Sequence, residues 1–173
     1  MSVPPREPDS GERPLLFEGS ILNVEQMPGG WEKVAKAAAV CVLAVRDGLV
    51  LGVEQPRPVV GATTWELPAG MIDPGETALE AAERELAEET QLGGRLSVLA
   101  EFYSSPGFTD EHTTVFRATH LEPVAGTPDP TEQITVSWRP LPELLRGLGT
   151  GELVTSASTA VGLALAASLN DEQ

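Results

Sequence analysis

The chain has 173 residues, of which 26 are acidic and 11 basic, so its formal net charge is −15 at pH 7. That length fits one domain, and a hydrophobic content of 41% is enough for a packed core. The excess of acid disfavours nucleic-acid partners and basic membrane-surface binding, because both need clustered positive charge. Phosphate substrates stay open, since a divalent cation held by carboxylates reverses the local charge.

Disulfide frameworks and membrane spans are also disfavoured. Cys41 is the single cysteine, so one chain can build neither a disulfide nor a thiolate zinc site, and we expect a small buried side chain there. No uninterrupted apolar stretch approaches the ~20 residues of a membrane helix. Residues 1–14 lack the apolar core of a signal peptide and are predicted to form a flexible tail. We therefore expect a cytoplasmic protein.

Short strands are expected along the first part of the chain, at residues 15–27 (one or two strands), 31–36, 37–45, 49–54 and 65–67. The pair Asp47-Gly48 between two apolar runs predicts a tight hairpin. Pro56 and Pro58 are expected to end the strand after that hairpin, because proline cannot donate a hydrogen bond within a sheet.

The clearest helix is predicted over 78–90. Thr77 and Glu80 have the spacing of a capping box, the segment is rich in Ala, Glu and Leu, and Gly93-Gly94 is expected to stop it. Further on, strands are expected at 96–103, 113–121 and 134–138, and helices at 142–148 and 154–169. No repeat or linker divides the chain.

Acid is concentrated in and just before this helix. Residues 70–92 hold seven carboxylates and one arginine, a local charge of −6. At about 100° per residue, three carboxylates form a stripe along the edge of the apolar face, namely Glu85, Glu88 and Glu89. The apolar face is expected to consist of Leu79, Ala82 and Leu86. The side chains expected to face solvent are Glu80 and Glu83.

Two interpretations of this stripe remain open from the helix pattern alone. Like charges at this spacing repel, and a partly buried row of them is costly without a positive partner. Hard divalent cations such as Mg²⁺ prefer carboxylate and carbonyl oxygens, and Arg84 is placed to clamp Glu88, four residues on. The alternative is a solvated acidic face, the usual fate of a charge run.

The segment from Gly70 to Leu92, GMIDPGETALEAAERELAEETQL, resembles the Nudix box. The positions that match are Gly70, Glu76, Arg84, Glu85, Leu86, Glu88, Glu89 and Leu92. Gln91 departs, because the family has Gly there; a left-handed residue costs about 1 kcal/mol when it is not Gly, and the helix can instead run on to Gly93. The resemblance implies an α+β fold, an α/β/α sandwich with a mixed central sheet, preceded by N-terminal antiparallel strands.

Other pieces resemble the ADP-ribose pyrophosphatase branch of that family: EQPRP at 54–58, WELPAG at 65–70, SSPGFTDE at 104–111 and the C-terminal GELVTSASTAVGLALA. Pro106 lies some 15 residues past the box, where the branch has a proline. The resemblance implies a Nudix domain over 37–173. It also implies N-terminal strands over 15–36 that the branch exchanges across a homodimer.

Metal-binding roles follow from the resemblance. Glu85 and Glu89 would be the principal ligands, Glu88 a shared ligand, and Ala69 would contribute its backbone carbonyl. Glu76 would be a further ligand or a structural partner at the helix start, and Arg84 would orient the carboxylates. A local salt bridge between Glu76 and Arg84 is the alternative. The implied ion is Mg²⁺, with Mn²⁺ as a substitute.

The general base and the substrate contacts are less closely defined by the resemblance. Glu132 is the first choice of base and Glu111 the second; an exposed loop acid is the alternative for either. Arg57 would contact the diphosphate and Glu66 the ribose or the metal network. Trp31 or Phe17 would stack on adenine unless it is a core residue. Two residues of the Pro-Gly motif are further candidates for substrate binding, namely Pro106 and Gly107.

The implied activity is Mg²⁺-dependent hydrolysis of ADP-ribose to AMP and ribose 5-phosphate by water attack on the diphosphate. One alternative is a Nudix hydrolase of another nucleoside diphosphate derivative, such as a nucleotide sugar or a dinucleotide polyphosphate. A second is a non-catalytic sensor that binds ADP-ribose, and a third is an acidic cation buffer.

Overall fold

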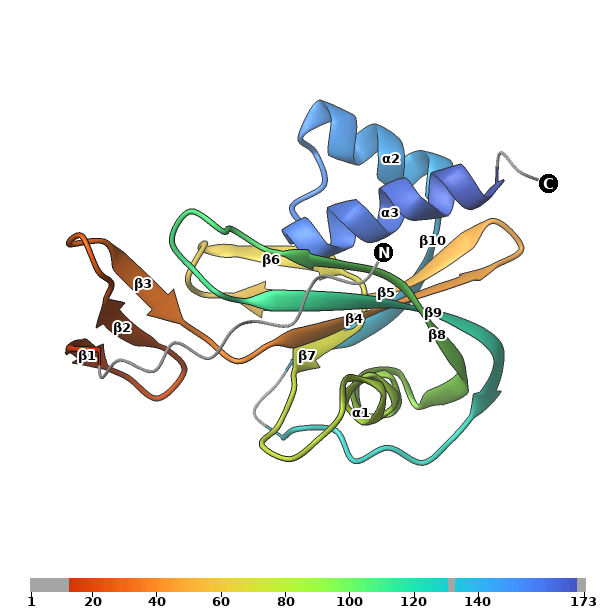
Figure 1. The fold of residues 1–173 in the computed structure, drawn as a ribbon. Coiled ribbons are helices and arrows are strands. Elements are labelled where there is room, and N and C mark those ends of the chain that lie inside the picture. The colour runs from red at the N-terminus through yellow and green to blue at the C-terminus, as the bar shows by residue number, and fades with distance from the viewer. Residues whose placement is uncertain (1–12, 131–132, 171–173) are drawn as a thin grey trace.

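A computed structural model of the chain describes residues 13–130 and 133–170. A mixed seven-stranded sheet forms the middle layer, with α1 on one face and α2 and α3 on the other (Figure 1). A separate three-stranded antiparallel sheet stands beside it. The expected α+β sandwich with N-terminal strands is therefore confirmed. Most of the predicted tail, residues 1–14, and the candidate base Glu132 lie outside the described residues.

The small sheet consists of β1 (Leu15–Glu18), β2 (Asn23–Gln26) and β3 (Glu32–Ala35). The large sheet has a main path in the order β10 (Thr135–Pro140), β5 (Leu49–Arg57), β4 (Ala39–Arg46), β9 (His112–Pro123) and β8 (Leu92–Tyr103). Two short strands pair outside that path, β6 (Ala62–Glu66) with β5 and β7 (Ala69–Met71) with β4. The three helices are α1 (Ala78–Thr90), α2 (Leu141–Thr150) and α3 (Ala157–Asn170).

The β4–β5 hairpin turns as predicted, and β5 is longer than predicted. Asp47 and Gly48 have φ values of 52° and 75°, as a two-residue hairpin turn of type I′ requires. The expectation that Pro56 ends β5 is wrong, because β5 continues to Arg57. The ladder from β10 reaches only Glu54, so beyond it β5 pairs with β6 alone and tolerates a proline as an edge strand does.

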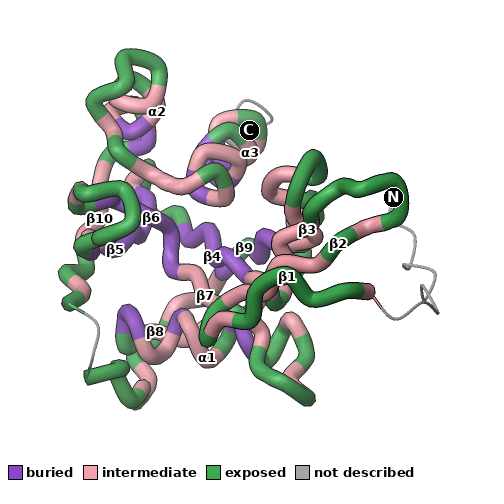
Figure 2. Tube along the Cα trace, turned by 90° about the vertical axis from the view of Figure 1, so that its left-hand side faces the viewer, coloured by how far each residue is buried: buried purple, intermediate pink, exposed green. Residues whose placement is uncertain are grey.

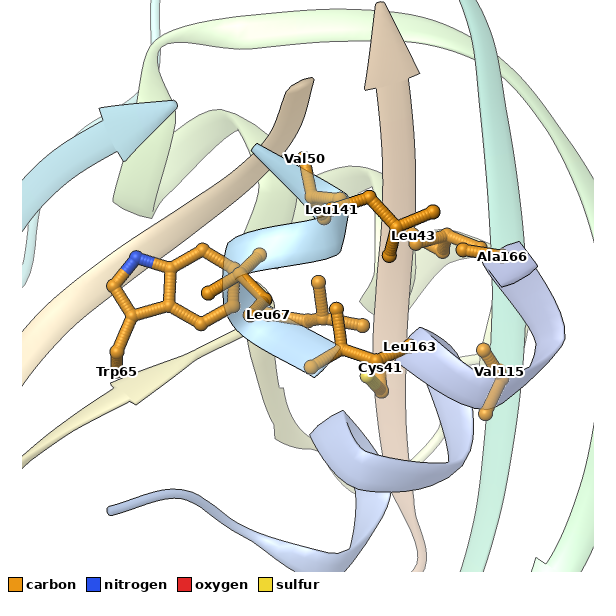
Figure 3. Packing of buried hydrophobic residues seen from close by; sticks show 10 residues of the cluster. Cys41, Leu43, Val50, Trp65, Leu67, Val115, Leu141, Leu163 and Ala166 are labelled. Atoms are coloured by element: carbon orange, nitrogen blue, oxygen red, sulfur yellow. The ribbon is translucent and has the colours of Figure 1, made fainter. Parts of the chain in front are cut away.

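The hydrophobic core has two halves because β4 is buried on both faces. Its side chains alternate, as those of a strand must: Cys41 and Leu43 face α2 and α3, while Val40 and Val42 face α1. Figure 3 shows Cys41 beside Leu163 of α3. The expected burial of Cys41 is confirmed, and burial raises the pKa of its thiol to about 12. In Figure 2 the buried residues cluster in the central strands and the inward helix faces.

Helix α1 starts where the sequence predicts. Thr77 and Glu80 form both hydrogen bonds of the capping box, and Ala78 is the first helical residue. Its buried face contains Ala81, Ala82 and Leu86. Leu79, expected on that face, is 43% exposed, whereas Ala78, one residue earlier, packs against the core.

Gln91 ends α1, so the helix does not run on to Gly93. The residue adopts the left-handed conformation at φ 58° and ψ 29°, which the family glycine would take without strain. Its side chain offsets that cost. The amide nitrogen donates to the carbonyls of Ala87 and Gly126, both at 3.1 Å, and its oxygen accepts from the Gly126 N–H at 3.3 Å. Gln91 thereby ties the segment after β9 to the end of α1.

Substitutions at Gln91 should separate the cost of its left-handed backbone from the gain of its side-chain hydrogen bonds. Gln91→Ala keeps the left-handed strain and loses the amide hydrogen bonds, so we expect destabilisation of about 1 kcal/mol. Gln91→Gly also loses the bonds but relieves about 1 kcal/mol of strain, so it should stay close to wild type. Urea unfolding of the three proteins measures the difference. Equal stability of Gln91→Ala and wild type would show that the side-chain bonds contribute nothing.

The segment before α3 is pinned to β6. Trp65 donates its backbone N–H to the Val154 carbonyl at 3.0 Å, and the Thr155 hydroxyl donates to the Trp65 carbonyl at 2.6 Å. These bonds hold residues 154–156 extended, so α3 begins at Ala157, later than expected. None of the helices in the described ranges combines the length and hydrophobicity required to span a membrane.

Candidate active site

A cleft of about 670 Å³ opens where the start of β4 pairs with β7. Its walls come from β4 to β7, α1, the turn between β8 and β9, and residues 154–158. Residues from distant parts of the sequence therefore meet in one place. The cleft lining includes seven of the site residues predicted from sequence, namely Arg57, Glu66, Ala69, Arg84, Glu85, Glu89 and Glu111.

Two carboxylates of α1 lie against β7. Glu89 is 8% exposed and its Oε2 accepts the Ala69 N–H at 3.1 Å. Glu85 lies over Gly70 so closely that a Cβ on Gly70 would be 1.9 Å from Glu85 Oε1. The glycine that opens the box thus makes the space in which the Glu85 carboxylate lies.

Arg84 connects the other box carboxylates. It donates to Glu76 twice, from Nε and Nη2, both at 2.9 Å, and from Nη1 to Glu85 at 2.6 Å and Glu88 at 3.3 Å. These hydrogen bonds hold the pKa of Glu76 below its usual range and raise that of Arg84. Both the expected clamp on Glu88 and the local salt bridge between Glu76 and Arg84 are present.

The donor atoms around the cleft suit a hard divalent cation. The side chains of Glu85 and Glu89 and the backbone of Ala69 border the same space, and Gly70 leaves room for the Glu85 carboxylate. Within the described ranges, however, no three Asp, Glu, His or Cys side chains converge as a metal cluster. Arg84 pairs with Glu85 and Glu88, and a cation would compete with the guanidinium for these oxygens.

Glu66 and Arg57 form a second polar unit across β5 and β6. Arg57 donates to both carboxylate oxygens of Glu66 at 3.0 and 3.1 Å, and the Thr64 hydroxyl donates at 2.6 Å. Burial by itself would raise the pKa of Glu66, but the hydrogen bonds from Arg57 and Thr64 outweigh it and hold that pKa below its usual range. Ionised Glu66 thus holds the Arg57 guanidinium in a fixed position at the cleft.

The lowered pKa of Glu66 predicts a pH-dependent contribution to stability. A carboxyl with a depressed folded pKa stabilises the fold above its unfolded pKa, about 4.3, and that contribution disappears as pH falls through the folded pKa. Between pH 5 and pH 3, wild type should lose more unfolding free energy than Glu66→Gln. Urea titrations across that range measure the difference. Parallel pH profiles of the two proteins would contradict the assignment.

Three predicted substrate-binding residues lie elsewhere. Trp31, Pro106 and Gly107 line a separate cavity of about 880 Å³ between β3 and the turn joining β8 to β9. In one copy of the chain, the structure therefore does not bring these residues to the carboxylates of α1. Glu88 and Glu76 meet Arg84 at the side of the cleft and are not part of its lining.

Thr64 and Lys36 are among the polar residues of the cleft lining that sequence reasoning missed. Thr64 lies two residues before Glu66 on β6 and so shares its face, a spacing that the sequence could have revealed. Lys36 reaches the cleft from the segment after β3 and forms an ion pair with Glu111. No spacing pattern in the sequence predicts Lys36 as a site residue, because strand packing alone brings it to the cleft.

The family model for the NUDIX domain matches residues 35–155. The chain belongs to the Nudix family. It is 38% identical to an ADP-ribose pyrophosphatase of Mycobacterium tuberculosis over 164 residues, covering 87% of this chain and 79% of that protein. It is also 38% identical to an ADP-ribose pyrophosphatase of Bacillus subtilis over 116 residues, covering 61% of this chain and 63% of that protein.

A solved structure described as an ADP compounds hydrolase has the same fold. The TM-score is 0.71 at 20% sequence identity, with 94% of this chain and 96% of the other covered. At that identity the likeness concerns the fold. As a Nudix hydrolase, the chain acts on nucleoside diphosphate derivatives, and enzymes of this family generally use a divalent metal ion.

Proposed function

We propose that this Nudix hydrolase cleaves ADP-ribose to AMP and ribose 5-phosphate with Mg²⁺, for which Mn²⁺ can substitute. The observation that carries the proposal is the single cleft in which Glu85 and Glu89 of α1 face the Arg57–Glu66 pair. A carboxylate group for a cation and a guanidinium for a phosphate match the two halves of a metal–diphosphate substrate. Relatives named ADP-ribose pyrophosphatase, at 38% identity, support this choice of substrate.

Glu85, Glu89 and the carbonyl of Ala69 would hold the metal, with Glu88 as a shared ligand and Glu76 as a further one. Bound there, Mg²⁺ supplies charge neutralisation at the phosphoryl oxygens and lowers the pKa of water. Arg84 orients Glu85 and Glu88 through its ion pairs. The bonds from Arg84 to Glu76 and to the Met71 carbonyl, at 2.9 Å, fix the guanidinium itself.

The remaining roles belong to residues on the other walls. Arg57, held by Glu66, would contact the diphosphate, and Glu66 would accept from a ribose hydroxyl. Glu111, which lines the cleft, would take a proton from the attacking water. Glu132 remains a candidate base that lies outside the described residues. Trp31, Pro106 and Gly107 would meet the nucleoside through a second subunit.

A homodimer formed through the small sheet is the second part of the proposal. Its support is the exposure of large apolar side chains on and around that sheet: Leu16, Phe17, Ile21 and Trp31 are 51, 56, 64 and 72% exposed. Sedimentation equilibrium should give twice the chain mass. Phe17→Asp should shift the protein toward the monomer, and a wild type that stays monomeric at micromolar concentration would refute the dimer.

A hydrolysis screen with product identification tests the activity. With Mg²⁺ present, ADP-ribose should yield AMP and ribose 5-phosphate faster than any nucleotide sugar or dinucleotide polyphosphate is cleaved. Preference for one of those substrates would overturn the choice of ADP-ribose. Tight binding of ADP-ribose without turnover would identify a sensor, and cation binding alone would identify a buffer.

A further inference from the structure

Both lysines of the sequence form ion pairs with the turn between β8 and β9. Lys33 on β3 and Lys36 just after it are the only lysines in the chain, and both meet the acids at the end of the β8–β9 turn. Lys33 Nζ lies 2.9 Å from Asp110 Oδ2 and 2.8 Å from Glu25 Oε2. Lys36 Nζ contacts Glu111 Oε1. Two consecutive acids, Asp110 and Glu111, are therefore each paired with one of these lysines.

The backbone around Lys36 is fixed to that turn. The Lys36 N–H donates to Asp110 Oδ1 at 3.2 Å. Two residues earlier, the Val34 N–H donates to the Phe108 carbonyl at 2.7 Å and the Val34 carbonyl accepts from Thr109 at 2.9 Å. The start of the Lys36 side chain is thus held in place, and only its flexible stem decides where the ammonium lies within the cleft.

Lys36 differs from the other cations of the cleft in how it is engaged. Arg57 donates two hydrogen bonds to Glu66, and Arg84 bonds three carboxylates and a carbonyl. Among the residues that the structure describes, Lys36 Nζ has one carboxylate partner; it carries three donor hydrogens on a side chain that is 33% exposed. It therefore has donors left for a ligand, whereas the Arg84 guanidinium is largely occupied.

The cleft needs such a donor if it takes an anion. Its lining holds five carboxylates against three cations, counting Glu66, Asp73, Glu85, Glu89 and Glu111 against Lys36, Arg57 and Arg84. A diphosphate would add further negative charge opposite Glu111. The Lys36 ammonium, which lines the cleft and pairs with Glu111, lowers the repulsion and supplies charge-assisted hydrogen bonds.

We propose that Lys36 is a phosphate-binding residue of the cleft, donating to a phosphoryl oxygen of the substrate while it keeps Glu111 beside that phosphate. The inference rests on the proposed function in one respect, that the substrate is a nucleoside diphosphate derivative. It adds a residue that no box position supplies.

Comparison of Lys36→Met with Lys33→Met tests this role. Lys36→Met should raise KM for ADP-ribose roughly 10-fold or more and change kcat less than KM. Lys36→Arg should restore KM to within about threefold of wild type. Lys33→Met removes the neighbouring ion pairs with Glu25 and Asp110, so a merely structural effect should appear there too. We expect its KM to stay within about twofold of wild type. Melting temperatures confirm that each variant is folded.

Binding of ADP in the presence of Mg²⁺, measured by calorimetry, separates this inference from the proposed function. A wild type that binds ADP but hydrolyses nothing would refute the hydrolase proposal, while a roughly 10-fold weaker ADP affinity of Lys36→Met would still support the lysine's role. If Lys36→Met matches wild type in both KM and ADP affinity, or loses kcat alone, the phosphate-binding role is wrong. Absence of both hydrolysis and ADP binding in wild type would overturn both.

Discussion

Glu85→Gln should lower kcat/KM by roughly 100-fold or more in saturating Mg²⁺ while the protein stays folded. The substitution keeps the size of the side chain but removes the charge that would hold a cation at the cleft. The side chain is only 13% exposed and accepts a hydrogen bond from Arg84 at 2.6 Å. Steady-state hydrolysis of ADP-ribose as a function of Mg²⁺ concentration measures the effect.

The matched control for that substitution is Glu83→Gln. Glu83 lies on the same helix and is exposed on its solvent side, so it loses the same charge without touching the cleft. We expect its kcat/KM to stay within about twofold of wild type. Wild-type turnover by Glu85→Gln would show that Glu85 is not a metal ligand. An equal loss in both variants would instead indicate a general effect of helix charge.

Much of the fold could be predicted because local signals and tertiary packing agree. The capping box at Thr77, the Asp47-Gly48 hairpin and the apolar run of β4 each specify their element within a few residues. The errors arise where a distant segment decides the outcome. Pro56 stays in β5 because β10 stops short of it, and α3 starts late because residues 154–156 pair with β6.

The residues of the candidate site likewise fall into those that local spacing predicts and those that distant segments bring in. The box residues on α1 share a helix, so their spacing alone places Glu85 and Glu89 together on one side of it. Lys36 reaches the cleft through strand packing, which no local pattern encodes, whereas Thr64 shares a strand face with Glu66. Trp31 was predicted to contact the substrate, yet one chain places it in a separate cavity.

Gly70→Ala should reduce activity strongly with little loss of stability. The added Cβ would lie 1.9 Å from Glu85 Oε1 and 2.1 Å from its Cδ, so the carboxylate has to leave its place over β7. Gly70 pairs with Val40 in the β4–β7 ladder and does not have a positive φ, so alanine fits the backbone. A flexible side-chain end can move at small cost, and we expect the unfolding free energy to change by about 1 kcal/mol or less.

The loss of activity should nevertheless be roughly 10- to 100-fold, because a displaced ligand no longer matches the cation geometry. Gly149→Ala is the control: nothing lies within 4 Å of its added Cβ, it is in α2, and alanine there should stabilise the helix by up to about 1 kcal/mol with full activity. Urea unfolding and Mg²⁺-dependent hydrolysis are measured on both. If Gly70→Ala retained wild-type kcat/KM, the Glu85 position over β7 would not be the one that catalysis uses. The first residue of the box would then serve the β4–β7 backbone and not the carboxylate.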